Sequence, residues 1–187
     1  MTRRVSFVIL GFFTLVVLAG YLFAQKAASF NGFELADQTG KILRKPADYR
    51  DHYEILGSWT VLDPKGSQMH LTYASPGTAE YYRQNKKFPD GAVLVKEIDG
   101  TDHAQMTTGD AHWATGTIQW FVLIKDEKHR FPNNALWGDG WGWALFKADA
   151  PDKQVATDYK KDCLGCHVPA KSTDWIYIKG YPVLQSK

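Results

Sequence analysis

The sequence of 187 residues is poor in cysteine, with two, and in methionine, with three, and it contains neither methionine nor histidine after position 167. The lack of a third cysteine argues against a zinc site, which would need further soft ligands. The chain has no large excess of charge of either sign: 22 lysines and arginines nearly balance 20 aspartates and glutamates, for a formal net charge of +2. The basic residues form no continuous block. This distribution does not indicate a nucleic-acid partner.

Both cysteines belong to one motif, Cys163-Leu164-Gly165-Cys166-His167. The pattern CxxCH is the attachment site of c-type haem, in which each thiol adds to a vinyl group and the histidine reaches under the iron. We therefore expect one covalently bound haem per chain, held by Cys163 and Cys166, with His167 as the iron ligand. A redox or structural disulfide is the alternative, although a thioredoxin-like CxxC belongs near a βαβ pattern and this motif follows a strand-rich region.

The N-terminal segment agrees with haem attachment, which takes place outside the cytoplasm. Arg3 and Arg4 precede an unbroken weakly polar to apolar run at 5–24, long enough to span a bilayer as a helix. Arg3 and Arg4 would stay on the cytoplasmic side, so we expect the rest of the chain on the periplasmic side of the inner membrane. A retained anchor is favoured over a cleaved signal peptide, because Leu22-Phe23-Ala24 lacks the small-x-small pattern and Lys26 spoils the next possible site.

The remaining chain is long enough for one domain with a real core, so we divide the protein into a membrane anchor or signal segment, 1–26, and a haem domain, 27–187. Alternating or β-branched runs predict five strands, at 54–62, 68–74, 92–98, 117–125 and 141–147. Helices are expected at 46–52, 76–87 and 157–167, and the last of these carries the haem motif. The chain has no internal repeat and no low-complexity segment.

The position of the motif near the C-terminus argues against the common small electron-transfer cytochromes. Small helical electron-transfer cytochromes carry CxxCH near their start and a methionine ligand downstream, but only 168–187 follow the motif here. A sixth ligand would have to come from upstream, where the possible residues are Met69, Met106, His70, His103, His112 and His129. An iron with a single protein ligand keeps an open face, which favours binding or converting a small molecule over electron transfer alone.

Several segments taken together resemble the cytochrome P-460 and cytochrome c′-beta superfamily. They are Phe88-Pro89-Asp90-Gly91, Val95-Lys96-Glu97-Ile98, Ile124-Lys125-Asp126, the haem motif, Asp174-Trp175-Ile176-Tyr177 and Tyr181-Pro182-Val183-Leu184. The resemblance covers most of the chain from about Tyr49 to Leu184. It implies an α+β fold, mainly an antiparallel β-sheet with flanking helices, which is usually paired as a homodimer and holds one five-coordinate c-type haem. Members of this superfamily bind or process nitric oxide, carbon monoxide or hydroxylamine.

Lys96 is the second residue of interest. In the P-460 branch the lysine of this segment bonds to the haem edge, and Lys96 occupies the matching position. By period-two alternation it shares a strand face with Leu94 and Ile98, so it can point into apolar surroundings that would leave its amine neutral and nucleophilic. The alternative is a lysine at a strand edge with its head in water.

The resemblance also indicates what lines the distal side of the haem. The pocket acid of the family aligns with Phe121, and an arginine of the hydroxylamine-oxidising branch aligns with His70, so the general base expected for that oxidation is missing. Bulky apolar side chains in place of the acid resemble the c′-beta branch instead. Our candidates for this wall are Phe88, Trp120 and Phe121, with His70 as a polar pocket group. Ordinary core packing is the alternative for the three aromatic residues.

Two functions remain open from the sequence. The first is a haem protein that binds nitric oxide or carbon monoxide at an open distal site, as a sink, carrier or sensor. The second is an oxidoreductase that converts hydroxylamine or nitric oxide at a lysine-cross-linked haem and passes electrons to a partner. Plain electron transfer is disfavoured by the missing downstream ligand.

Overall fold

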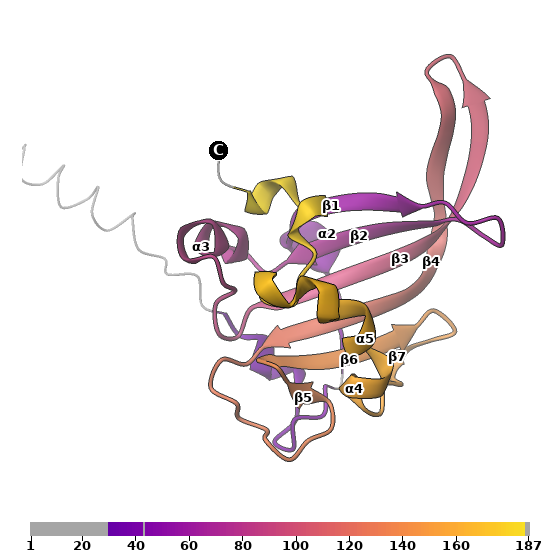
Figure 1. The fold of residues 1–187 in the computed structure, drawn as a ribbon. Coiled ribbons are helices and arrows are strands. Elements are labelled where there is room, and N and C mark those ends of the chain that lie inside the picture. Colours follow the sequence, from indigo (N-terminus) through magenta and orange to yellow (C-terminus); the bar gives the residue numbers. More distant parts are fainter. Residues whose placement is uncertain (1–29, 43, 186–187) are drawn as a thin grey trace, which may run out of the picture.

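A computed structural model of the protein describes residues 30–42 and 44–185, and these residues build one antiparallel sheet with short helices on both faces (Figure 1). The strands are β1 (Glu54–Val61), β2 (Gln68–Ala74), β3 (Val93–Met106), β4 (Gly109–Lys125), β5 (Trp137–Gly138), β6 (Trp141–Lys147) and β7 (Ala150–Gln154). Their order across the sheet is β1-β2-β3-β4-β6-β5, and β7 pairs with β6. The predicted fold class, α+β with a mainly antiparallel sheet, is confirmed.

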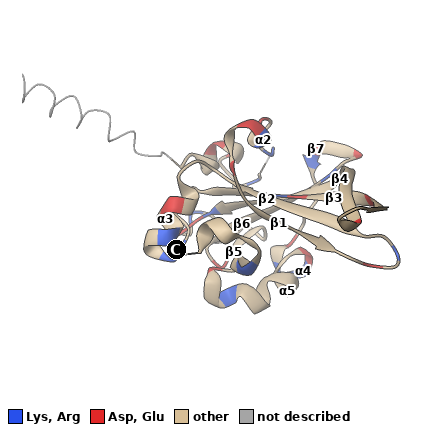
Figure 2. Ribbon diagram, turned by 90° about the horizontal axis from the view of Figure 1, so that it is seen from above, with Lys and Arg blue, Asp and Glu red and all other residues tan. Residues whose placement is uncertain are grey.

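The helices are short and lie on either side of this sheet. They are η1 (Gly32–Leu35), α2 (Tyr49–His52), α3 (Thr78–Asn85), α4 (Tyr159–Asp162), α5 (Leu164–His167), η2 (Val168–Thr173), η3 (Ile178–Gly180) and η4 (Pro182–Leu184). Figure 2 shows α2 on one face and α4 with α5 on the other. The C-terminal part of the chain therefore crosses a single face of the sheet, and it brings the haem motif there.

Strand alternation divides the core into two layers. On β3, Leu94 packs with the C-terminal segment, whereas its neighbours Val93 and Val95 pack on the opposite face with Tyr49 of α2. The same alternation holds on β4, where Leu123 faces the C-terminal segment. Period-two side-chain direction thus decides which residues can reach the haem motif.

The helix expected at 157–167 is wrong as a single helix. Asp158 caps α4 by accepting a hydrogen bond from the backbone N–H of Lys160 at 3.0 Å, and the chain then leaves helical geometry at Cys163, with φ −131° and ψ −46°. Cys163 is buried in the core layer beneath the C-terminal segment. The haem motif therefore begins at a break between two single-turn helices.

Two glycines let the C-terminal segment lie close to β1. A Cβ added to Gly57 would lie 2.2 Å from the carbonyl oxygen of Gly180, and a Cβ added to Gly180 would lie 2.3 Å from the Trp59 ring. Neither position has room for a side chain. The pairing of β1 with β2 also shifts register between Ile55 and Gly57, so the close approach coincides with an irregularity in the strand.

Strands β3 and β4 extend well beyond the predicted ranges and form a hairpin that projects from the sheet (Figure 1). We refer to residues 101–117 as the projecting hairpin. Its tip is a tight turn between the paired residues Met106 and Gly109. The expectations at 92–98 and 117–125 were too short because both faces of this hairpin are largely exposed, so burial imposes no regular hydrophobic alternation on it.

The predicted membrane segment at 5–24 lies outside the described residues. Within the described part of the chain, no helix is long and apolar enough to cross a membrane.

Candidate functional site

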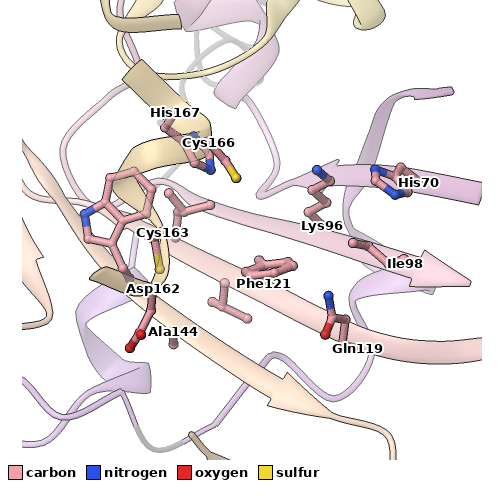
Figure 3. A pocket seen from close by; sticks show the side chains of 13 residues that line it. His70, Lys96, Ile98, Gln119, Phe121, Ala144, Asp162, Cys163, Cys166 and His167 are labelled. Atoms are coloured by element: carbon pink, nitrogen blue, oxygen red, sulfur yellow. The ribbon is translucent and has the colours of Figure 1, made fainter. Parts of the chain in front are cut away.

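A pocket lies between the sheet and the C-terminal segment, and most of its lining side chains are apolar. Figure 3 shows Cys163, Cys166 and His167 on one side of it, with Lys96 and His70 on the other and Phe121 between them. The other lining residues are Ile98, Gln119, Val122, Leu123, Trp143, Ala144 and Asp162. A second, smaller hollow shares Lys96, Leu123, Cys166 and His167 with the first. The thiols and the imidazole of the motif therefore face one largely apolar space.

The imidazole of His167 is held in one tautomer and one orientation. Its Nδ1 lies 2.7 Å from the carbonyl oxygen of Trp175, which can only accept, so Nδ1 carries the proton and Nε2 keeps its lone pair. An edge-to-face contact with the Trp143 ring, at 4.9 Å between centroids, further restricts the orientation of the imidazole. Burial lowers the pKa of His167, while the hydrogen bond to Trp175 opposes this shift. A neutral imidazole with a hydrogen-bonded Nδ1–H is the usual arrangement of a metal-binding histidine.

The carbonyl that orients His167 lies in a constrained turn. Asp174 and Trp175 both have positive φ, 57° and 67°, which is uncommon for residues other than glycine and unusual for one as bulky as tryptophan. Surrounding contacts must hold this turn in place. The Asp174 carboxylate accepts from Lys125 Nζ at 2.6 Å and from the Phe88 backbone N–H at 3.1 Å, and the Asp174 carbonyl accepts from Trp141 Nε1 at 3.0 Å.

The two thiols occupy different environments. Cys163 is buried, and burial raises its pKa to about 12, with smaller contributions from Asp162 and Cys166. Cys166 is exposed, and neither cysteine forms a disulfide. Both line the same pocket as His167. The alternative reading of the motif as a disulfide therefore gains no support from the structure.

Lys96 points into the pocket from β3. Its Nζ lies 5.1 Å from the centroid of the Trp59 ring, and burial lowers its pKa. No carboxylate of the described residues forms an ion pair with it. Desolvation shifts Lys96 towards the neutral amine, which is the nucleophilic form, and the nearby Cys166 opposes this shift.

His70 lies beside Lys96 on the neighbouring strand β2 and is neutral. Trp59 Nε1–H donates to His70 Nδ1 at 3.0 Å, and His70 Nε2 therefore carries the proton and donates to Gln68 Oε1 at 3.2 Å. Burial, with a smaller contribution from the charge of Lys96, lowers the pKa of His70 to about 4. His70 thus offers a polar edge to the pocket without a positive charge at neutral pH.

A family model described as cytochrome P460 matches residues 46–178 of the chain. The chain belongs to the cytochrome P460 family. No curated protein matches it. Membership in this family makes the protein a haem-binding cytochrome.

The pocket fits the haem that the cytochrome P460 family implies. Its apolar lining and the free Nε2 of His167 suit a flat aromatic group with a ligated iron, and both thiols lie at the same wall. The P460 match also covers residues that hold the site from outside the pocket. Phe88, Lys125 and Asp174 come from three separate matched segments and meet at the turn beside His167.

Two of the residues predicted for the distal wall of this P460 protein, Phe88 and Trp120, do not line the pocket. Phe88 is fully buried in the core, 4.6 Å from Tyr82 and 5.4 Å from Trp141 between ring centroids. Trp120 precedes Phe121 on β4 and therefore points to the opposite face of the sheet.

On that opposite face Trp120 belongs to a polar network. Its Nε1 donates to the Tyr49 hydroxyl at 2.8 Å, and this hydroxyl donates to the buried Glu97 carboxylate. Arg50 donates to both oxygens of Glu97, at 2.8 and 3.0 Å. Lys96 and Glu97 are adjacent in sequence but serve opposite faces, one at the pocket and one in this network.

Sequence reasoning missed two polar residues that line the pocket, Gln119 and Asp162. Gln119 stands two residues before Phe121 on the same strand face, so alternation alone could have identified it. Asp162 directly precedes Cys163, but its Oδ2 accepts from Thr157 and from the backbone N–H of Asp158, at 2.7 to 3.2 Å. These hydrogen bonds, led by those from the backbone of Thr157 and Asp158, lower the pKa of Asp162. This carboxylate is therefore a poor base.

Of the six possible sixth ligands, only His70 lines the pocket. The others lie away from it: Met69, Met106, His103, His112 and His129. The single carboxylate among the lining residues is Asp162.

Proposed function

We propose that this cytochrome P460-family protein holds one c-type haem covalently through Cys163 and Cys166, with His167 as the iron ligand, and binds nitric oxide or carbon monoxide on the opposite face. One observation carries the proposal: both thiols and the correctly oriented imidazole of His167 face a single pocket whose far side is formed by Phe121. When bound, haem supplies an iron position that coordinates small ligands.

The residues of the chain give this site its selectivity. Phe121 and Ile98 present apolar surface that excludes water, so a bound diatomic molecule has few hydrogen-bond partners. Gln119 and His70 are neutral polar groups at the edge of the pocket. Among the described residues that line the pocket, none offers a free carboxylate to accept protons, so the site is better suited to binding than to a reaction that must remove protons.

The first test is the covalent link. Acidified organic extraction should leave haem on the wild-type polypeptide and release it from the Cys163→Ala, Cys166→Ala double variant. The His167→Ala variant should keep its haem but lose the normal iron coordination, seen in the absorption spectrum. Release of all the haem from the wild-type chain would refute the attachment.

The second test is the open face. Carbon monoxide added to the reduced holoprotein should rapidly convert the spectrum to a six-coordinate low-spin form. A resting spectrum that is already low-spin and does not respond to the gas would show that a second protein ligand occupies the iron.

The second candidate function is an oxidoreductase acting on hydroxylamine or nitric oxide, and the position of Lys96 favours it. Its partly desolvated amine faces the pocket near Cys166. Such an amine can attack an oxidised porphyrin edge, so tandem mass spectrometry of the digested holoprotein would find the peptide containing Lys96 joined to the haem peptide. An unlinked Lys96 together with no turnover would favour the binding function alone.

Catalysis can be tested at the position where the base is missing. Phe121→Glu should accelerate hydroxylamine oxidation, by about 100-fold or more for a well-placed carboxylate. Phe121→Gln should not, because glutamine is similar in size to glutamate but cannot act as the base. Efficient turnover by the wild-type protein, measured with an electron acceptor, would overturn the preference for ligand binding.

The location and assembly of the protein are part of the same proposal. A c-type haem, the basic residues Arg3 and Arg4 and the apolar run at 5–24 support a position on the periplasmic side of the inner membrane, with the N-terminal segment as an anchor. Sedimentation of the holoprotein tests the expected homodimer, and fractionation of membranes tests the anchor.

A further inference from the structure

The projecting hairpin carries a cluster of side chains that the haem site does not use. His103 on β3 pairs directly with His112 on β4, and Asp110 stands two residues before His112. Residues opposite each other on paired strands, and residues two apart on one strand, share a face of the ribbon. The register of this hairpin therefore gathers three potential metal ligands on one face.

The distances between these side chains match those of a metal site. His103 Nδ1 lies 2.9 Å from one carboxylate oxygen of Asp110, and His112 Nε2 lies 3.3 Å from the other. The three ligating atoms all lie within 4.8 Å of one another. Ligands at 2.0–2.1 Å from a tetrahedral ion stand about 3.4 Å apart, so small side-chain rotations would suffice for binding.

Other contacts hold the two imidazoles in this arrangement. Their rings stack, with centroids 4.9 Å apart and planes inclined by 11°. The Nδ1 atom of His112 is buried and has no hydrogen-bond partner within the described residues, so Asp110 provides the polar contact that orients this ring. Exposed fractions of 61%, 52% and 20% for the side chains of His103, Asp110 and His112 leave the cluster open to an incoming ion.

We propose that His103, Asp110 and His112 form a second metal site, which binds a late first-row divalent ion, Zn²⁺ or Cu²⁺. Two imidazoles and one carboxylate suit these ions, whereas Mg²⁺ and Ca²⁺ prefer sites built from oxygen ligands alone. The remaining coordination positions face solvent. The site is independent of the haem, and it joins β3 to β4 near the tip of the projecting hairpin, where the structure has no hydrophobic core.

The test is titration of the holoprotein, freed of loose metal by a chelator, with Zn²⁺ in a calorimeter. Saturable binding of one ion per chain is expected. His103→Gln, His112→Gln and Asp110→Asn should each weaken binding by about tenfold or more, since the loss of even an outer-shell partner of a metal site costs 10–100-fold. His52→Gln is the matched control, because His52 forms an exposed ion pair with Asp48, 3.0 Å away, and no third ligand joins them within the described residues.

Two further measurements keep the outcome decisive. Zn²⁺ should slow amide hydrogen exchange in residues 101–117 of the wild-type protein and not in the variants, while the haem spectrum stays unchanged in all of them. A parallel titration with Cu²⁺ should be tighter, as the order of stability of divalent ions requires, with a paramagnetic resonance spectrum showing two nitrogen ligands. Absence of saturable binding of both ions, or equal affinity in the wild-type and histidine variants, would overturn the proposal.

Discussion

The ion pair between Lys125 and Asp174 helps to hold the turn whose carbonyl orients His167. Both side chains are largely buried, with exposed fractions of 8% and 16%, and Lys125 Nζ lies 2.6 Å from Asp174 Oδ1. Asp174→Asn removes the negative charge while keeping the size of the side chain and the positive φ that asparagine tolerates. It would leave the ammonium group of Lys125 buried without a counter-charge.

The expected cost follows from the burial of the pair. At an effective dielectric constant of 20, the attraction over this distance is about 6 kcal/mol before desolvation is subtracted. Breaking a buried pair by removing one partner costs about 3–5 kcal/mol, and the amide oxygen of asparagine still accepts one hydrogen bond, so we expect about 3 kcal/mol. With a urea dependence of about 2 kcal/mol/M, the unfolding midpoint should fall by about 1.5 M.

The assay is urea unfolding of the holoprotein followed by circular dichroism. Glu127→Gln is the control, because its pair with Lys87 at 2.5 Å is about half exposed and should shift the midpoint by less than about 0.5 M. The double variant Lys125→Met, Asp174→Asn should recover much of the loss, since it buries no lone charge. A midpoint for Asp174→Asn equal to that of the control would refute the reasoning.

Three further predictions test other parts of the architecture. Gly57→Ala should destabilise the fold strongly, because its Cβ would meet the carbonyl oxygen of Gly180 at 2.2 Å, whereas Gly116→Ala, with nothing within 4 Å, should be tolerated in the same thermal-unfolding assay. Tyr49→Phe should cost about 1–3 kcal/mol in urea unfolding, because the buried Glu97 and the half-buried Trp120 both lose the hydroxyl. For His70, whose pKa falls to about 4, the unfolded chain binds more protons than the native one, so stability should decline from pH 6.5 towards 4. The His70→Gln variant should show a shallower decline, and an unchanged slope would count against the assigned burial.

The local pattern of the sequence accounts for the sheet and for part of the site. Period-two runs located the main strands because each buries at least one face, and alternation correctly predicted that Lys96 shares a face with Ile98, which also lines the pocket. The same rule separates the two aromatic residues predicted on β4. Trp120 and Phe121 are adjacent, so both cannot line one face, and Gln119 rather than Trp120 accompanies Phe121 at the pocket.

Other features depend on contacts between distant segments, which periodicity does not report. Phe88 has an apolar side chain suitable for a pocket wall, yet its ring fills the core while its N–H anchors Asp174. The break at Cys163 interrupts a segment that reads as one helix, because burial of that side chain outweighs a weak local preference. The projecting hairpin escaped prediction because it has no buried face to impose a pattern.

The sequence by itself predicted the haem chemistry that we propose, because the spacing of CxxCH places two thiols and one imidazole within five consecutive residues. It also determined the layering of the sheet, because side-chain direction alternates along any strand. Only the tertiary structure decided which carbonyl orients His167, which groups surround Lys96, and that His103, Asp110 and His112 meet on one face. These arrangements depend on the register of long-range pairs and on the packing of the C-terminal segment, both of which are set by the whole fold.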